Sequence, residues 1–133
     1  MKLYFLDAGF VSVTDLLWLA LIVLLGITVV EWIVLLLFSI NTPGKAFLHS
    51  LIVNVASAVL GYALAEPVAS IGQNDSSGLL SWFVFFAVTL IVEGFLLQLL
   101  NKQKPAKKVW LAAITMNIVT YAALYFLAGY REY

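Results

Sequence analysis

Residues 16–30 read LLWLALIVLLGITVV, a run without a charged side chain in which Thr28 carries the only hydroxyl group. A helix with this sequence is apolar on every side, so none of its faces suits water. A membrane β-barrel does not fit either, because its strands are segments of about ten residues that alternate polar and apolar side chains. We therefore predict a helix in contact with lipid.

The chain contains four such apolar runs, at about 15–39, 45–65, 79–100 and 107–128. Each run is long enough to cross a hydrocarbon core of about 30 Å. The sequences Asn41-Thr42-Pro43-Gly44 and Gln103-Lys104-Pro105 interrupt them with turn residues that do not continue a helix. The predicted fold is an all-α integral membrane protein, a four-transmembrane-helix bundle built from two tandem helical hairpins.

A longer polar connection at residues 66–78 separates the two hairpins. The first unit, residues 1–65, combines an N-terminal segment with the first hairpin, and the second unit, residues 79–133, holds the second hairpin and a short tail. The N-terminal segment lacks a cleavage site made of small residues, and its aromatic side chains suit lipid headgroups, so we expect it to stay at the membrane interface. Asp15 is expected to cap the first helix.

The composition excludes a soluble enzyme. Hydrophobic residues make up 64% of the chain and charged residues 11%, and the mean hydropathy is +1.06. Soluble domains carry about a quarter charged residues. Cysteine is absent, which excludes a disulfide framework, a thiolate metal site and an iron–sulfur cluster. We expect no cofactor and no metal site, and a structural or interfacial role for the single histidine, His49.

Charge is distributed unequally between the two ends of the predicted helices. The two hairpin turns carry five of the seven basic residues and no acidic one: Lys45, Lys102, Lys104, Lys107 and Lys108. The positive-inside rule then places both turns in the cytoplasm, with the termini and the middle loop outside the inner (plasma) membrane. We expect these lysines to set the topology and to contact anionic headgroups. Four lysines in a short turn without arginine do not indicate nucleic-acid binding.

The two hairpins match one another at their rare polar and proline positions. At an offset of 62, Glu31 aligns with Glu93, Pro43 with Pro105 and Lys45 with Lys107. At an offset of 63, Asn54 aligns with Asn117, Ser57 with Thr120 and Tyr62 with Tyr125. With two helices in each copy, both copies enter the membrane in the same direction. The sequence therefore predicts a parallel repeat related by a pseudo-twofold axis along the membrane normal.

Glu31 and Glu93 are the only ionisable residues deep within the apolar runs. Glu31 and Asn54 lie about 11.5 residues from the centre of the first turn, and Glu93 and Asn117 lie about 12 residues from Pro105. At 1.5 Å per residue this depth is about 17 Å, near the middle of a bilayer. A carboxyl group at that depth should face the interior of the bundle. We predict a buried polar ring of Glu31, Asn54, Glu93 and Asn117.

Hydroxyl groups at helical spacing support an inward orientation of this ring. Thr28 and Thr89 precede the two glutamates by about one turn, and Ser57 and Thr120 follow the two asparagines. Hydrogen bonding between helices, worth about 0.6 kcal/mol on average, is the plainest interpretation of such groups. Asparagine and serine alone would suffice for that purpose, however. The repeated acid therefore leaves proton or ion handling, and docking onto a partner helix, as alternatives.

These observations favour a non-enzymatic function. We expect an assembly or accessory subunit that associates with itself or with another membrane protein in the lipid bilayer. The alternative is a small transporter or channel for protons, cations or a small solute that uses the glutamate and asparagine ring, enclosed by a homo-oligomer. An intramembrane enzyme acting on a lipid or quinone fits less well, because no group is present to activate a nucleophile.

Overall fold

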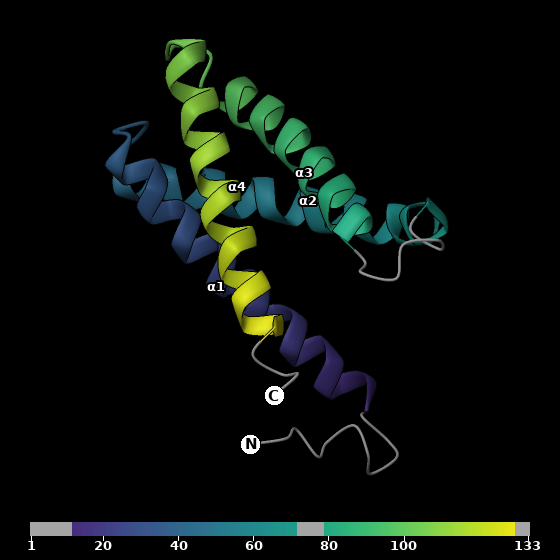
Figure 1. Ribbon diagram of the computed structural model, residues 1–133. Helices are drawn as coiled ribbons and strands as arrows, with labels where there is room; N and C mark the ends of the chain where they lie inside the picture. Colours follow the sequence, from purple (N-terminus) through teal and green to yellow (C-terminus); the bar gives the residue numbers. More distant parts are fainter. Residues whose placement is uncertain (1–11, 72–78, 130–133) are drawn as a thin grey trace.

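The computed structural model describes residues 12–71 and 79–129. The expected interfacial segment, most of the middle loop and the C-terminal tail lie outside these residues. The described part is all-helical, as predicted, and consists of α1 (Val13–Leu37), α2 (Pro43–Ile71), α3 (Leu79–Leu100) and α4 (Ala106–Gly129) (Figure 1). All four helices are long and apolar enough to span a membrane.

The first turn of α1 is closed by a capping box. Ser12 is the N-cap, since its Oγ accepts a hydrogen bond of 3.1 Å from the backbone N–H of Asp15, and the Asp15 carboxylate accepts from the Ser12 backbone N–H in return. The expectation that Asp15 itself is the N-cap was therefore wrong. Asp15 occupies the third helical position, where an acidic side chain completes the box and complements the helix dipole.

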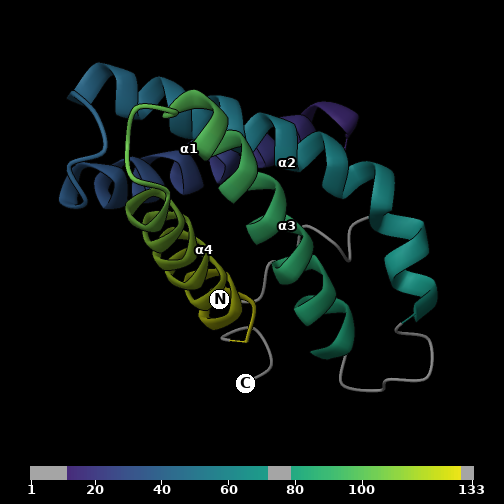
Figure 2. The ribbon, with the colours of Figure 1, turned by 90° about the horizontal axis from the view of Figure 1, so that it is seen from above.

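Helix α2 continues beyond its expected end at about residue 65 and runs to Ile71 through Pro67. Proline lacks the N–H that the helix ladder needs, and its ring crowds the preceding turn. Figure 2 shows α2 bending toward its C-terminal end. The exposed position of Pro67 lets the helix bend without disturbing the core, so the predicted connecting loop begins later than residue 66.

The helices form a ring in which α1 and α3 each contact both α2 and α4. Figures 1 and 2 show the two hairpins opening away from their turns. The apolar core lies between the turns and the level of the glutamates, and its fully buried side chains include Leu35, Ile40, Val53, Leu97 and Met116. The bundle is therefore closed by packing at the turn end.

Aromatic contacts hold each hairpin together near its turn. Trp32 stacks edge-on against Phe47 at 5.9 Å between ring centroids, and its Nε1 donates to the Pro43 carbonyl at 2.9 Å. Trp32 is thus bonded within its own hairpin. In the second hairpin the ring of Trp110 lies over Gly94, where a Cβ atom would come within 2.7 Å of the Trp110 Cη2.

A polar contact joins the two turns. Asn41 donates from its side-chain amide to Asn101 Oδ1, and the same Nδ2 lies 3.1 Å from Nδ1 of His49. Asn101 is fully buried and donates in turn to the Leu97 carbonyl at 2.7 Å. His49 thus takes part in a structural contact at the turn end of the bundle.

Candidate functional site

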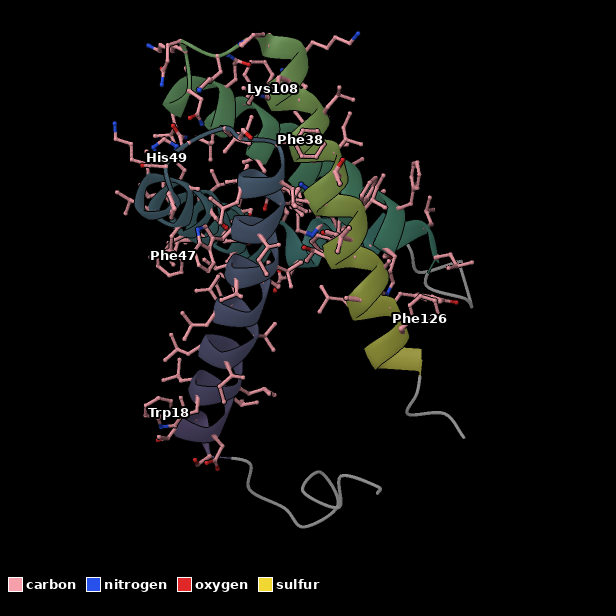
Figure 3. The ribbon with its side chains drawn as sticks, turned by 90° about the vertical axis from the view of Figure 1, so that its left-hand side faces the viewer. Trp18, Phe38, Phe47, His49, Lys108 and Phe126 are labelled. Carbon is pink, nitrogen blue, oxygen red and sulfur yellow. The ribbon has the colours of Figure 1, made fainter. Side chains whose placement is uncertain are left out.

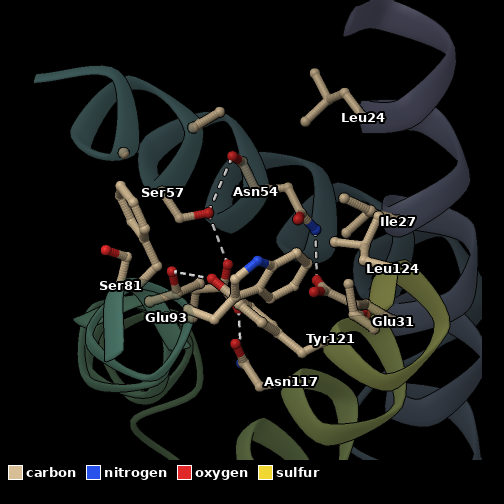
Figure 4. A pocket seen from close by; sticks show the side chains of 16 residues that line it. Leu24, Ile27, Glu31, Asn54, Ser57, Ser81, Glu93, Asn117, Tyr121 and Leu124 are labelled. Carbon is tan, nitrogen blue, oxygen red and sulfur yellow. Dashed lines mark hydrogen bonds between the residues drawn. The ribbon is translucent and has the colours of Figure 1, made fainter. Parts of the chain in front are cut away.

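Each of the four helices contributes one side chain to a buried polar cluster. Glu31 on α1 and Glu93 on α3 are each 1% exposed, as is Asn117 on α4, and Asn54 on α2 is 4% exposed. Figure 4 shows the two glutamates approaching from opposite sides, with Asn54 above them and Asn117 below. The structure therefore brings together the four residues that lie at the same predicted depth in the sequence: Glu31, Asn54, Glu93 and Asn117.

The two hairpins contain the same Glu–Asn hydrogen bond. Asn54 Nδ2 donates to Glu31 Oε2, and Asn117 Nδ2 donates to Glu93 Oε2 at 2.8 Å. Each asparagine amide also donates at 3.0 Å to the backbone carbonyl four residues earlier, that of Ser50 or Ala113. This second bond fixes the side-chain orientation, so each amide is held against the carboxyl group of its own hairpin.

Serine side chains on α2 extend the cluster in both directions. Ser50, Asn54 and Ser57 follow one another at the four- and three-residue spacing that puts side chains on one helix face. Ser57 Oγ lies 2.6 Å from Glu93 Oε1 and so connects the two hairpins. Ser50 Oγ donates to the Thr28 carbonyl at 3.0 Å and lies 3.4 Å from Glu31 Oε2.

The threonines expected to support the cluster differ in their hydrogen-bond partners. Thr28 donates its hydroxyl to the Leu24 carbonyl at 2.8 Å, within its own helix. Thr89 pairs with the hydroxyl of Tyr121 at 2.9 Å. Thr120 is 6% exposed, and within the described part of the chain its Oγ1 has no hydrogen-bond partner. Only Ser57, among the expected supporting residues, bonds a glutamate directly.

A cavity of about 480 Å³ opens beside the cluster. The two carboxyl groups, the two amides and the hydroxyl groups of Ser57, Thr89 and Thr120 line it at the level of the cluster. Its remaining wall is mostly apolar and aromatic and reaches toward the helix ends opposite the turns: Leu24, Ile27, Ala58, Gly61, Ser81, Trp82, Phe85, Tyr121 and Leu124. Polar groups at one end and apolar walls elsewhere are the usual composition of a small-molecule site.

The aromatic wall was missed in the sequence. Tyr121 makes edge-on contacts with Phe86 at 5.2 Å and with Trp82 at 6.0 Å between ring centroids. Tyr121 and Leu124 follow Asn117 by four and seven residues, so they share its helix face. Extending the helical spacing from Asn117 would therefore have found Tyr121 and Leu124.

The predicted topology lysines lie apart from the cavity. Lys45, Lys102 and Lys107 are exposed and Lys104 and Lys108 are half-buried, all at the turn end of the helices. Figure 3 shows Lys108 and His49 at that end and Trp18 at the opposite end of α1. Within the described ranges, no group of three or more His, Cys, Asp or Glu side chains could hold a metal ion.

Comparison with known proteins gives no match. No family model matches the chain, and no curated protein and no solved structure matches it significantly.

Proposed function

We propose that this protein is a small multi-pass membrane protein that binds a small cation in the cavity beside Glu31 and Glu93 and carries it across the bilayer. One observation carries the proposal: two buried carboxyl groups from different hairpins line a single cavity. Carboxyl groups inside membrane helices are rare and mark ion pathways, proton relays and ligand sites. Two of them at one site suit a cation or a proton.

Membrane insertion is part of this proposal. Most side chains in the apolar windows of all four helices face outward, which would expose a very large apolar surface to water. In a bilayer the same surface contacts lipid, and the helices satisfy their backbone hydrogen bonds internally. Under the positive-inside rule, the lysines at the turns favour a cytoplasmic position for both turns, with the cavity mouth toward the outer side.

A pseudo-twofold relation between the hairpins supports a site shared by both halves. The matched Glu–Asn bonds are one sign of it. A second sign is that an aromatic contact lies beside each glutamate, because Trp32 packs on Phe47 in the first hairpin and Trp110 lies over Gly94 in the second.

The packed core gives the cavity a closed end. Fully buried side chains fill the bundle between the glutamates and the turns, so a ligand that enters from the opposite ends meets the carboxyl groups and then the core. This is the arrangement of one state of a carrier. For the ligand to move to the cytoplasmic side, the two hairpins have to shift against one another. A homo-oligomer would enclose the path of the ligand during this shift.

Flux measurements test the proposal. The purified chain in proteoliposomes should move protons or methylammonium down a gradient, and the double variant Glu31→Gln with Glu93→Gln should abolish this flux. The matched control is Glu66→Gln, because Glu66 is exposed and does not line the cavity. Flux that is unchanged in the double variant, or lost equally in the control, contradicts the proposal.

Assembly into a larger membrane complex is a second candidate, favoured by the N-terminal half of α1. Every side chain from Val13 to Val23 is exposed, and Trp18 lies at the end of α1 far from the turns (Figure 3). A helix face left bare in this way can bind a second copy or a partner helix. The mass of the complex extracted in mild detergent distinguishes these states, and a stoichiometric larger partner without flux would favour the accessory role.

A further inference from the structure

We propose that the ligand of the cavity is an amphipathic organic ammonium ion, whose N–H groups bind Glu31 Oε1 and Thr120 Oγ1 while its apolar part lies against Trp82, Phe85 and Tyr121. This inference rests on the proposed function and names the ligand class of the same site. The two glutamates occupy matched positions in the sequence, but they differ in their hydrogen bonds, and the inference is drawn from this difference.

The carboxyl group of Glu93 is fully engaged by the protein. Its Oε1 lies 2.6 Å from Ser57 Oγ and its Oε2 accepts from Asn117 at 2.8 Å, so both oxygens have partners. Glu31 differs, because Asn54 and Ser50 both approach the same oxygen, Oε2. Among the residues that the structure describes, none forms a hydrogen bond with Glu31 Oε1.

The missing partner of Glu31 can be identified from the repeat. Ser57, which binds Glu93 from the neighbouring hairpin, aligns with Thr120 in the second half. Thr120 lies on α4, the helix that contacts α1, and both Thr120 and Glu31 line the cavity. Yet Thr120 Oγ1 is buried and has no partner in the described part of the chain. A buried hydroxyl without a hydrogen bond destabilises the protein, and a ligand with N–H donors would supply that bond.

The chemistry of the two groups selects a positively charged donor. Carboxyl and hydroxyl oxygens both accept hydrogen bonds, and a bond from an ammonium group to a carboxylate is about twice as strong as a neutral one. A bare Ca²⁺ or Mg²⁺ ion fits less well, because these ions take six or more oxygen ligands and both oxygens of Glu93 already have partners in the protein. The ligand class that follows is an ammonium ion with at least two N–H groups.

The aromatic wall accounts for the apolar part of the ligand. Trp82 and Tyr121 form an edge-on pair with 6.0 Å between ring centroids, and both line the cavity together with Phe85. Such rings bury apolar groups, and their faces attract cations. A volume of about 480 Å³ is large enough for a phenethylammonium ion and lies within the range of small-molecule sites.

Equilibrium binding to the full chain in detergent, measured by calorimetry, tests this assignment. The probe is phenethylammonium, with 2-phenylethanol as its uncharged analogue and N,N,N-trimethylphenethylammonium as the charged analogue without N–H groups. We expect both analogues to bind at least tenfold more weakly than the probe. Equal binding of the neutral analogue would overturn the role of the carboxyl group, and equal binding of the trimethyl analogue would overturn the hydrogen bonds.

Variants locate the site. Glu31→Gln should weaken probe binding at least tenfold, and more than Glu93→Gln. Thr120→Val should weaken it about tenfold, the size of one charge-assisted hydrogen bond, and Thr120→Ser should restore it. The matched control is Thr115→Val on the same helix, because Thr115 donates to the Leu111 carbonyl outside the cavity. A loss in Thr115→Val equal to that in Thr120→Val, or no loss in Glu31→Gln, overturns the assignment.

Failure of this inference can be told apart from failure of the proposed function. Cation flux that depends on the glutamates, without binding of phenethylammonium, refutes the ligand class alone. Absence of both flux and binding in protein that keeps its helicity refutes both proposals. Circular dichroism and gel filtration of each variant show whether a lost signal reflects unfolding, and the Thr120→Ser variant keeps the test valid if Thr120→Val fails to fold.

Discussion

Among single residues, the proposed function is based on Glu31 and Glu93, because a carboxyl group deep in an apolar bundle lowers stability. On insertion scales an acidic residue at the centre of a membrane helix costs about 2.5–3.5 kcal/mol. The protein offsets part of this cost with one asparagine amide for each carboxyl group and with Ser57. Interhelical hydrogen bonds alone would not require the acids, which is why we propose that they serve a ligand or a proton.

Removing one partner of a buried pair should cost more than removing both. Asn117→Leu leaves Glu93 Oε2 without its 2.8 Å donor, and we expect a loss of about 1–3 kcal/mol in unfolding free energy. The double variant Glu93→Leu with Asn117→Leu should recover most of that loss, because Ser57, the other partner of Glu93, still donates to the Asn54 carbonyl at 3.1 Å. Unfolding in mixed detergent micelles measures both values. A double variant less stable than the single one would show that the pair itself stabilises the fold.

Gly94 is required by the close approach of Trp110. In Gly94→Ala the new Cβ would lie 2.7 Å from Trp110 Cη2, so the indole has to move. We expect a destabilisation of about 1–3 kcal/mol, typical of an overpacked core. Gly26→Ala is the control, since nothing lies within 4 Å of its added Cβ and alanine favours a helix. Thermal unfolding of the two variants should therefore shift in opposite directions.

At the element scale, the end of α1 is set by backbone geometry. The Ile40 N–H donates to the Leu35 carbonyl at 3.0 Å and the Ser39 N–H to the Leu36 carbonyl at 2.8 Å, which is a Schellman motif. The motif needs a left-handed residue, and Ser39 supplies it at φ 47° in place of the usual glycine. The buried side chain of Ile40 then anchors the chain as it leaves the helix.

Replacing Ser39 should reveal the strain at this position. A left-handed backbone conformation costs a residue with a Cβ about 1–2 kcal/mol. Glycine avoids this cost but loses more backbone entropy on folding, so the net gain in stability is smaller. We expect Ser39→Gly to stabilise the protein by about 0.5–1 kcal/mol and Ser39→Val to destabilise it, measured by thermal unfolding. The prediction is wrong if both variants lower the midpoint.

The elements themselves were predictable from the sequence, and the contacts between them were predictable only in part. The long apolar runs define the four helices, and equal depth selects Glu31, Asn54, Glu93 and Asn117 because both quantities follow from spacing along one chain. The packing of Trp32 on its own hairpin, the passage of α2 through Pro67 and the aromatic wall around Tyr121 depend on the rotation of each helix and on its neighbours. Spacing alone does not determine those.

In the molecule as a whole, the proposed topology has both turns on one side of the membrane. The chain lacks cysteine, so a single introduced thiol reports its own position. We expect Lys104→Cys, in the second turn, to react with an impermeant maleimide only after the cells are permeabilised, and Val13→Cys, at the start of α1, to react in intact cells. Labelling of both thiols in intact cells would rule out the proposed topology.

An organic ammonium ion that reaches the cavity should occupy it beside Glu31. A hydrophobic carbodiimide reacts with protonated carboxyl groups. After treatment of native membranes with this reagent, mass spectrometry measures the adduct on each glutamate separately. We expect an adduct on Glu31 that excess phenethylammonium suppresses, while any adduct on the exposed Glu66 does not change. An unmodified Glu31 beside a modified Glu66, or an adduct on Glu31 that saturating phenethylammonium leaves unchanged, would contradict the binding of an organic ammonium ion at Glu31.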